Sequence, residues 1–372
     1  MKIAVLGNGT VGSSLVKILS EMKIKDLDYC GVLVRRNIEG RTDLYYNIDE
    51  IVSDKEIDTV CECIGGVTDA YTYVKSLLES GKNVVTSNKA LVVDKGSELI
   101  KTAKEKGVAF LFSAACGGGI PILRNLRKTA CTDKVKSAFG ILNGTCNYIL
   151  TQMEEEDVTL ENAIYQAQNL GYAEKDPTAD ISGLDTLRKV QLIDVVGFGK
   201  LPEAGGNCEG IEFISSEIIK LLRKEGKRIR LVGKTGENAD GVYAYVVPRI
   251  VKDSDMLSSI KQNYNFFSLE AENVGRLCMS GMGAGGAPTA SNMVRDLLSV
   301  SEGETDMADV PSVCSANNKV HSDFRLYKFE RKNVINMQLM RNIDVCEMFR
   351  TVSEKRAEGE KIFFCEEPSD II

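Results

Sequence analysis

The 372-residue chain is poor in several features that mark particular classes of protein. It has one histidine, His321, and none of its 11 cysteines forms a Cys-x-x-Cys pair, so a zinc site has few candidate ligands. No apolar run approaches the ~20 residues that a membrane-spanning helix needs, and the apolar run at the N-terminus is too short for a signal peptide. We therefore expect a soluble, cytoplasmic protein with no membrane partner.

An excess of basic residues is also missing. Lysine and arginine number 46 against 53 aspartate and glutamate residues, which gives a formal net charge of −7. A nucleic-acid partner requires a basic face that displaces counterions, so we expect none. A local basic pocket for a phosphorylated small molecule is compatible with this charge. The cysteines fit a reducing compartment, where they serve as small buried hydrophobic side chains.

The length of 372 residues predicts about two folded domains, at roughly 150 residues per domain. Up to residue 130, short apolar runs alternate with helical patterns, which is typical of a parallel sheet covered by helices. Strands are predicted there at 3–7, 28–35, 57–64, 83–86 and 108–112. Farther on, strands are predicted at 135–142, 229–232, 242–247, 266–269, 275–279 and 320–329, and helices at 158–170, 183–196, 289–298 and near 344–360. The later strands alternate in the manner of an antiparallel sheet, so we expect a second, mixed α+β domain.

A Gly-x-Gly-x-x-Gly motif directly follows the first predicted strand and opens a helix at Thr10 and Val11. Gly7 permits the tight turn, Gly9 lets the backbone approach a pyrophosphate, and Gly12 allows close helix–strand packing. The helix N-terminus then offers N–H groups and a positive dipole end to the phosphates. A glycine turn without a ligand is the alternative. The strand–turn–helix context favours a dinucleotide, and hence an α/β fold with a Rossmann-type parallel-sheet nucleotide domain.

The end of the second predicted strand indicates which dinucleotide binds. An NAD site usually has an acidic residue there, for the ribose hydroxyl, whereas this chain has Arg35 and Arg36. Guanidinium groups bind a 2′-phosphate in a bidentate manner, so the sequence favours NADP over NAD. The alternative is that both arginines are solvated loop residues.

A helix predicted from residue 183 carries a candidate proton donor. Asp185 and Lys189 lie four residues apart on one helix face, and the apolar residues that follow indicate that this face is buried. A buried lysine beside a carboxylate is a plausible general acid, because burial lowers the pKa of an ammonium group. From the spacing alone, a capping box that begins at Ser182 and an ordinary helix salt bridge explain the same residues.

Taken together, these motifs resemble the homoserine dehydrogenase family. The resemblance spans about residues 1–300, and its most specific part is the block from Gly171 to Lys189. The other matching segments are the N-terminal glycine motif, Gly65-Gly66, Thr86-Ser87-Asn88-Lys89-Ala90-Leu91, Gly117-Gly118-Gly119-Ile120-Pro121-Ile122, Asn143-Gly144-Thr145, and the run from Gly283 to Ser291.

The resemblance implies the NAD(P)H-dependent interconversion of L-aspartate 4-semialdehyde and L-homoserine. Lys189 would be the general acid/base, and Asp185 would hold Lys189 and bind the reacting end of the substrate. Glu174 would anchor the substrate ammonium group with the support of Asp180, and Lys89 would lie near the nicotinamide and contribute to catalysis. Further cofactor contacts would come from Gly65, Ser87, Gly283 and Gly285.

The resemblance also suggests a monovalent cation such as Na⁺. In relatives, main-chain carbonyl groups bind it, and the corresponding residues here are Cys116, Gly118 and Ile120. Ser113 stands where the family commonly has a glutamate, and the missing carboxylate weakens such a site.

Three domains follow from the resemblance. The dinucleotide-binding domain covers 1–130 and is completed by a return helix within 282–305. The substrate-binding domain, through which the family pairs as a homodimer, covers 131–281. The extension at 306–372 has no assigned role, because it is short for the regulatory domain of long family members. The segment 323–329 is a candidate remnant strand of that domain.

Three alternatives remain open at this point. The chain could reduce a related amino-aldehyde, although Glu174 and the Asp185–Lys189 pair argue for homoserine. A phosphorylating semialdehyde dehydrogenase would need a cysteine paired with a histidine, and the one histidine lies outside every motif. A catalytically silent sensor that binds a dinucleotide is the third alternative, and such a sensor has no need of Lys189.

Overall fold

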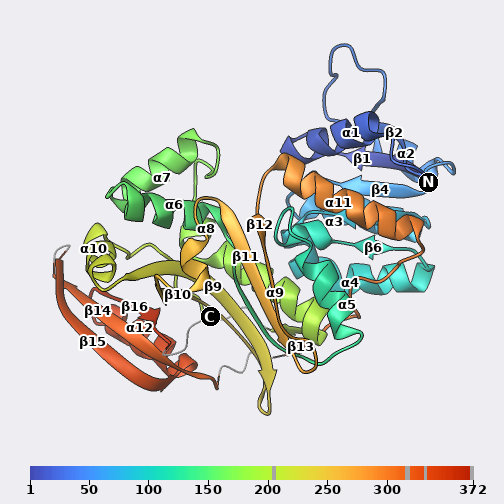
Figure 1. Cartoon of the computed structure of the whole chain (residues 1–372). Helices are drawn as coiled ribbons and strands as arrows, with labels where there is room; N and C mark the ends of the chain where they lie inside the picture. The colour runs from blue at the N-terminus through green and yellow to red at the C-terminus, as the bar shows by residue number, and fades with distance from the viewer. Residues whose placement is uncertain (203–206, 315–318, 331–332, 369–372) are drawn as a thin grey trace. The chain divides into compact units, whose positions relative to one another are not determined.

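A computed structural model describes residues 1–202, 207–314, 319–330 and 333–368 (Figure 1). The chain divides into two compact units. Unit 1 comprises residues 1–132, 195–201 and 282–312, and unit 2 comprises residues 133–194, 202–281 and 313–372. The predicted α/β fold class is confirmed, since a parallel sheet forms unit 1 and a mixed sheet forms unit 2. Over the described residues, none of the helices has the length and hydropathy required to cross a membrane.

Unit 1 is a six-stranded parallel sheet with the order β3-β2-β1-β4-β5-β6. The chain builds outward from β1 in one direction and then from β4 in the other, so the β1/β4 boundary is a topological switch point, where α/β sheets bind ligands. The strands are β1 (Lys2–Leu6), β2 (Asp28–Leu33), β3 (Leu44–Tyr45), β4 (Thr59–Glu62), β5 (Asn83–Thr86) and β6 (Phe110–Leu111). The helices are α1 (Thr10–Met22), α2 (Ile48–Ser53), α3 (Thr68–Glu79), α4 (Lys89–Lys106), η1 (Ser113–Ala115), α5 (Ile122–Ala130) and α11 (Gly286–Ser301).

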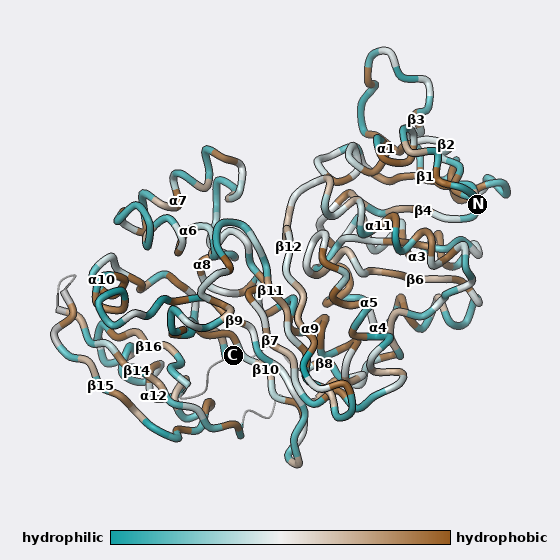
Figure 2. The backbone as a smooth tube through the Cα atoms, in the orientation of Figure 1, coloured by the Kyte–Doolittle hydropathy of each residue, from teal (hydrophilic) through white to brown (hydrophobic). Residues whose placement is uncertain are grey.

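Burial on both faces explains the composition of the central strands. The four residues from Ile3 to Leu6 are fully buried, which matches the continuous apolar run that a parallel strand between two helical layers requires (Figure 2). Helix α11 packs on α1, although nearly 280 residues separate their starts. The contact is close, because a Cβ on Gly286 would lie 2.5 Å from the carbonyl oxygen of Thr10.

Unit 2 is an eight-stranded sheet with the order β12-β11-β7-β9-β10-β16-β14-β15. Helix α9 packs on β9, since a Cβ on Gly233 would meet the side chains of Thr186 and Val190. The strands are β7 (Val135–Ile141), β9 (Lys227–Asn238), β10 (Gly241–Lys252), β11 (Tyr264–Ala271), β12 (Gly275–Met282), β14 (His321–Glu330), β15 (Asn333–Asp344) and β16 (Ile362–Glu366). The helices are α6 (Gly144–Glu155), α7 (Leu160–Asn169), α8 (Thr178–Ile181), α9 (Leu184–Phe198, of which residues 195–198 are assigned to unit 1), α10 (Ser216–Lys224), η2 (Met256–Ser259) and α12 (Val345–Ala357). Two short strands, β8 (Lys200–Pro202) and β13 (Ser312–Cys314), form a separate two-stranded sheet.

The C-terminal extension is more regular than the sequence indicates. One strand and one helix are predicted there, whereas the described residues form the four strands β13, β14, β15 and β16 and the helix α12. Phe324, Met348 and Phe364 of the extension share one hydrophobic cluster with Tyr245 and Val247 of β10. From residue 313 on, the described part of the extension is therefore an integral part of unit 2, whereas residues 306–312 belong to unit 1. Its residues 315–318, 331–332 and 369–372 lie outside the described part of the chain.

Candidate active site

The glycine motif forms a turn whose shape depends on its glycines. Gly7 has a φ of +92°, which favours glycine, and a Cβ on Gly12 would lie 2.0 Å from the carbonyl oxygen of Gly7. A Cβ on Gly9 would have no heavy atom within 4 Å. Gly9 caps α1, whose first residues are Thr10 and Val11, so the N–H groups of this helix end lie beside the open side of the turn. This arrangement fits a diphosphate.

The two arginines after β2 are exposed. Arg35 pairs with Asp69 of α3 at 3.0 Å, but its side chain is 90% exposed, so the pair leaves it accessible to a ligand. A third arginine was not predicted: Arg41 reaches back to the glycine turn and donates to Asn8 Oδ1 at 3.5 Å. The sequence indicates Arg41 only in that three arginines lie close together between the second strand and the next helix. The loop beside the glycine turn therefore carries Arg35, Arg36 and Arg41.

A buried carboxylate organises the end of β4. Glu62 is fully buried, and its Oε1 atom accepts hydrogen bonds from the N–H groups of Ile64 (2.8 Å) and Gly65 (3.1 Å). Its Oε2 atom accepts a hydrogen bond of 2.5 Å from the Thr86 hydroxyl of β5. Burial raises the pKa of Glu62, and these hydrogen bonds oppose the rise. Glu62 was not predicted as a site residue; its signal in the sequence is a charged residue at the end of a buried apolar strand.

Asn88 joins the same turn to helix α4. Its amide donates to the carbonyl oxygen of Gly66 at 2.6 Å, and its Oδ1 atom caps α4 by accepting the N–H of Leu91 at 3.1 Å. Lys89 is the first residue of α4, and Ser87 lies partly buried just before it. The predicted cofactor residues Gly65, Ser87 and Lys89 thus belong to one hydrogen-bonded corner of unit 1.

Two glycine-rich loops of unit 1 pack backbone against backbone. A Cβ on Gly118 would lie 2.5 Å from the carbonyl carbon of Gly283, and the N–H of Gly119 donates to Met282 O at 3.1 Å. Gly285 directly precedes α11 and has a φ of +116°. Only glycines allow this close approach and backbone shape, so the two loops form one structural feature.

The residues expected to bind a monovalent cation do not fit one. The carbonyl oxygens of Gly118 and Ile120 accept hydrogen bonds from the side-chain amide of Asn292, at 2.9 and 3.4 Å. An N–H donor therefore already binds two of the three expected ligands, and the third residue, Cys116, is fully buried. The cation stays an expectation that this geometry argues against, because an amide donor already contacts two of its three expected carbonyl ligands.

In unit 2, α9 holds Lys189 and Asp185 together. Lys189 Nζ lies 2.8 Å from Asp185 Oδ2 and donates to the carbonyl oxygen of Leu142 at 2.6 Å. The two side chains are only 11% and 10% exposed, so this is a buried ion pair and not a solvated surface bridge. The Leu142 oxygen also accepts from Asn265 Nδ2 at 2.9 Å, which fixes its position. The Ser182 hydroxyl is buried without a hydrogen-bond partner among the described residues, so the capping box is not formed.

Asn143 connects the two carboxylates of the site. Its Nδ2 atom donates to Asp180 Oδ1 at 2.7 Å and to Asp185 Oδ2 at 2.8 Å. Its Oδ1 atom accepts the N–H of Cys146 at 2.7 Å and so caps α6. The side chain is therefore oriented by backbone on one side and by two carboxylates on the other. Asn143 lies in one of the segments that match the family, but no role was predicted for it.

The predicted ammonium anchor, Glu174, lies on the loop that leads into α8 and α9. Its carbonyl oxygen accepts from Gln168 Nε2 at 3.1 Å, and the same loop is held where Thr145 Oγ1 donates to Tyr172 O at 2.6 Å. The Glu174 side chain is exposed. The hydrogen bonds of the site thus join Asn143 to the aspartates, while Glu174 offers its carboxylate to solvent on the adjoining loop.

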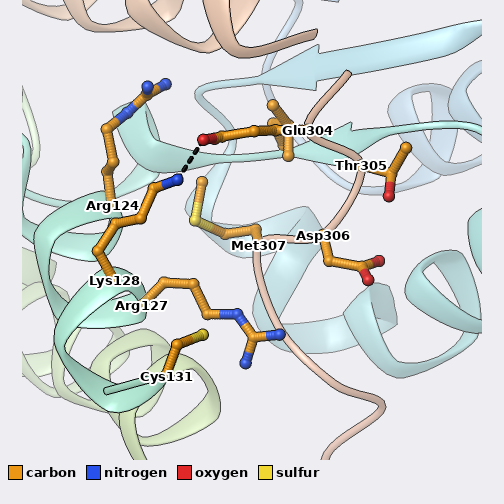
Figure 3. Close-up of a pocket in the computed structure, with 9 residues that line it drawn as sticks. Arg124, Arg127, Lys128, Cys131, Glu304, Thr305, Asp306 and Met307 are labelled. Carbon is orange, nitrogen blue, oxygen red and sulfur yellow. Dashed lines mark hydrogen bonds and ion pairs between the residues drawn. The ribbon is translucent and has the colours of Figure 1, made fainter. Parts of the chain in front are cut away.

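A cavity of about 270 Å³ in unit 1 is lined by none of the predicted residues (Figure 3). It lies between α5 and residues 304–307 and has three basic side chains in its wall. Lys128 pairs with Glu304, Arg127 lies 3.5 Å from Asp309, and Arg124 lies 2.7 Å from Asp296. Because carboxylates neutralise these three cations, the cavity has no surplus charge for an anion.

Comparison with known proteins agrees with this geometry. A family model for the NAD-binding domain of homoserine dehydrogenase matches residues 7–113, and one for homoserine dehydrogenase matches residues 121–298. Homoserine dehydrogenase of Bacillus subtilis is 34% identical over 353 residues, which cover 90% of this chain and 81% of the relative. That of Lactococcus lactis is 35% identical over 322 residues, which cover 82% and 75%.

Solved structures give the same result. A homoserine dehydrogenase from Thiobacillus denitrificans superposes with a TM-score of 0.87 at 26% identity, over 99% of this chain and 98% of that one. A hyperthermophilic archaeal homoserine dehydrogenase in complex with NADPH superposes with a TM-score of 0.71 at 25% identity, over 82% and 99%. The chain belongs to the homoserine dehydrogenase family of NAD(P)-dependent oxidoreductases.

Proposed function

We propose that this chain interconverts L-homoserine and L-aspartate 4-semialdehyde, with Lys189 as general acid/base and with NADP in preference to NAD. The observation that carries the proposal is the buried Lys189–Asp185 pair, held by the Leu142 carbonyl group and by Asn143. Burial of an ion pair costs folding free energy, so a pair of this kind indicates a functional role for the two residues.

A bound nicotinamide cofactor would supply the hydride to the aldehyde carbon and would accept it in the reverse direction. As the carbonyl oxygen of the substrate gains negative charge, Lys189 donates a proton from its ammonium group and so completes the hydroxyl group. In the direction of oxidation, Lys189 accepts that proton. Asp185, 2.8 Å away, stabilises the charged form of the lysine and keeps Nζ at one position.

The carboxylates of the 174–185 segment supply the negative charge that an amino-acid ammonium group requires. Glu174 is accessible on its loop, and Asp180 is held by Asn143. We assign Glu174 to the substrate ammonium group and Asp180 to its support. Lys89, at the start of α4, is assigned to the nicotinamide end of the cofactor.

The diphosphate of the cofactor is assigned to the turn Gly7–Gly12, whose open side adjoins the N-terminus of α1. Arg35 and Arg36 support a preference for NADP. Both side chains are exposed, and a 2′-phosphate requires guanidinium groups that are accessible to it. We also propose a cytoplasmic homodimer that pairs through the 131–281 domain, with no nucleic-acid partner.

The test is nicotinamide absorbance with L-homoserine at alkaline pH, where release of a proton favours oxidation, with NADP⁺ and NAD⁺ measured side by side. We expect turnover with the wild type and a loss of at least ~100-fold in Lys189→Ala, as for removal of a general acid/base. Lys220→Ala is the matched control, because Lys220 is an exposed lysine on α10 whose partner is Asp157. Its turnover should equal that of the wild type.

The possible results separate the alternatives. Equal rates with NADP⁺ and NAD⁺ would remove the role assigned to Arg35 and Arg36. Retention of activity in Lys189→Ala would show that another group transfers the proton. Absence of turnover in wild-type protein that still binds a dinucleotide would contradict the enzyme proposal and favour a sensor.

A further inference from the structure

Helix α11 holds the glycine-rich loop 113–120 of unit 1 through a buried amide. The Nδ2 atom of Asn292 lies within hydrogen-bond distance of three main-chain carbonyl oxygens, those of Ser113 (3.3 Å), Gly118 (2.9 Å) and Ile120 (3.4 Å). The Asn292 side chain is fully buried. Three carbonyl dipoles therefore converge on one nitrogen atom in the interior of the unit.

The orientation of this amide follows from its surroundings. Carbonyl oxygens only accept hydrogen bonds, so the NH₂ group and not the amide oxygen must face them. Its hydrogens carry the partial positive charge that offsets the repulsion among the three oxygens. A monovalent cation bound to the same oxygens would perform this task, and it would be repelled by the amide hydrogens already there.

The negative charge beside the loop is also already compensated. Asp296 is fully buried one helical turn after Asn292, and its Oδ2 atom accepts the N–H of Ser113 at 2.8 Å. Its Oδ1 atom accepts from Arg124 at 2.7 Å, so the carboxylate is paired with a guanidinium group. No surplus anionic charge thus remains at this carboxylate to attract a cation.

The loop 113–120 also contacts the glycine segment that is expected to bind the cofactor. Arg295 of the same helix donates to the carbonyl oxygen of Gly119 at 2.8 Å, and Gly118 packs against the backbone of Gly283. Side chains of α11 therefore bind the loop at Ser113, Gly118, Gly119 and Ile120. Through this loop they support the segment 283–285, which is expected to contact the cofactor.

We propose that the side-chain amide of Asn292 takes the place of a monovalent cation in this loop, so that the chain stays folded and active without Na⁺ or K⁺. The part of the proposal that concerns activity rests on the proposed function. The part that concerns stability does not, because it depends only on the contacts between α11 and the loop.

Thermal unfolding tests the stability part. The unfolding midpoint is measured in NaCl, KCl and tetramethylammonium chloride at equal ionic strength. The wild type should give the same midpoint in all three salts. Asn292→Ala removes the buried donor that these carbonyl oxygens share, and Ser113 O and Ile120 O keep only the N–H groups of Cys116 and Ile122. Its midpoint should therefore fall by on the order of 5 °C. Saturating Na⁺ should then recover part of that loss.

Asn292→Asp is the second variant, and it serves even if the alanine variant fails to fold. Its carboxylate adds an oxygen ligand to the three carbonyl oxygens, which is the hard, oxygen-only donor set that alkali cations prefer. Its midpoint should rise with Na⁺ in a saturable manner that tetramethylammonium does not reproduce. Asn125→Ala, a substitution of another asparagine of unit 1, on α5, should not acquire any dependence on the cation.

Activity with L-homoserine in the same salts completes the test. The proposal requires that wild-type turnover be independent of the alkali cation. A saturable, Na⁺-specific rise in either the midpoint or the turnover of the wild type would overturn it. It would equally be overturned if Asn292→Ala matched the wild type in stability and ignored every cation. If the protein shows no turnover at all, the proposed function fails, while the unfolding results still decide the role of Asn292.

Discussion

Gly9 and Gly12 lie in one turn, yet a methyl group would meet different surroundings at each. At Gly9 the space within 4 Å is empty, and the backbone φ of −74° is one that alanine adopts without strain. Gly9→Ala should therefore keep the wild-type unfolding midpoint and lose dinucleotide affinity, because its methyl group enters the space assigned to the diphosphate. Isothermal titration with NADP⁺, together with thermal unfolding, checks both expectations.

Gly12→Ala is the matched variant in the same turn. Its Cβ would lie 2.0 Å from the carbonyl oxygen of Gly7, so β1 and α1 must separate. We expect a loss of stability of roughly 1–3 kcal/mol, as for overpacking of a core. A Gly9→Ala protein that binds NADP⁺ like the wild type, or a Gly12→Ala protein of unchanged stability, would contradict this division of roles.

A contact between two site residues could be predicted from the sequence where both residues lie in one helix or strand. Asp185 and Lys189 are an example, because four residues on one helix define their contact. Asn143 and Asn292 were missed because their partners come from distant parts of the chain: residues 180 and 185 for the first, and residues 113–120 for the second. Only the fold brings these partners together, so no local pattern indicates them.

Elements were predicted well where one periodicity runs without interruption. The strand expected at 83–86 has these bounds, and the helix expected at 183–196 corresponds to α9. The prediction failed at β15, where the β14–β15 pairing shifts register twice and Met337 and Leu339 are exposed. Bulges disturb the alternation of apolar and polar residues on which a strand prediction depends. Helices α4 and α6 begin inside polar motifs, because Asn88 and Asn143 cap them.

Helix α12 of the extension is tied to the segment that supports the start of α9. The buried Glu209 accepts hydrogen bonds from Arg356 Nη1 at 3.0 Å and Nη2 at 2.6 Å. The neighbouring Ile211 donates its N–H to Ile181 O at 2.7 Å, just before α9. Helix α12 thus stabilises, through Glu209 and Ile211, the start of the helix that carries Lys189.

Arg356→Gln removes the cation and leaves Glu209 buried without it. We expect a loss of stability of roughly 1–3 kcal/mol, because a buried acceptor loses a charge-assisted donor. Since residues 181–183 lead into α9, we also expect a higher KM for L-homoserine with a smaller change in kcat. Urea unfolding and steady-state kinetics measure the two effects.

Lys355→Gln provides the control for that variant. Lys355 is the neighbouring cation on α12, it is 41% exposed, and it lies 3.9 Å from Glu360. We expect wild-type stability and KM for Lys355→Gln. If both variants behave alike, the bond between Arg356 and Glu209 has no special role in bracing α9.

On the scale of the whole of unit 2, the fully buried Glu366 unites β16 with the rest of the sheet. Its carboxylate contacts Lys234 at 2.9 Å and Arg249 at 3.3 Å, and it accepts hydrogen bonds from the hydroxyls of Tyr245 and Ser322. Burial alone would raise the pKa of Glu366, but the two cations and the hydrogen bonds outweigh burial and lower it from 4.5 to about 2.

The stability of the protein at acidic pH should reveal the contribution of the Glu366 carboxylate. The unfolded chain takes up the proton near the ordinary pKa of 4.5, whereas the folded protein resists it down to about pH 2. The stabilisation by Glu366 is therefore complete above pH 4.5 and is lost as the pH falls from 4.5 to about 2. The difference in urea midpoint between the wild type and Glu366→Gln should shrink from pH 7 to pH 3. Glu358→Gln, at an exposed carboxylate, should show no such trend.

The position of β16 between β10 and β14 has a consequence for the order of folding. Strand β10 pairs on one edge with β9, its neighbour in the chain, but on the other edge with β16, where the contact between Arg249 and Glu366 spans 117 residues. The first pairing is a local hairpin and forms fast, whereas the second must await closure of a long loop. During that interval the far edge of β10 is an unprotected strand edge. A second chain could insert its own β16 there, so domain-swapped dimers and aggregates are the characteristic misfolded products to expect at high concentration.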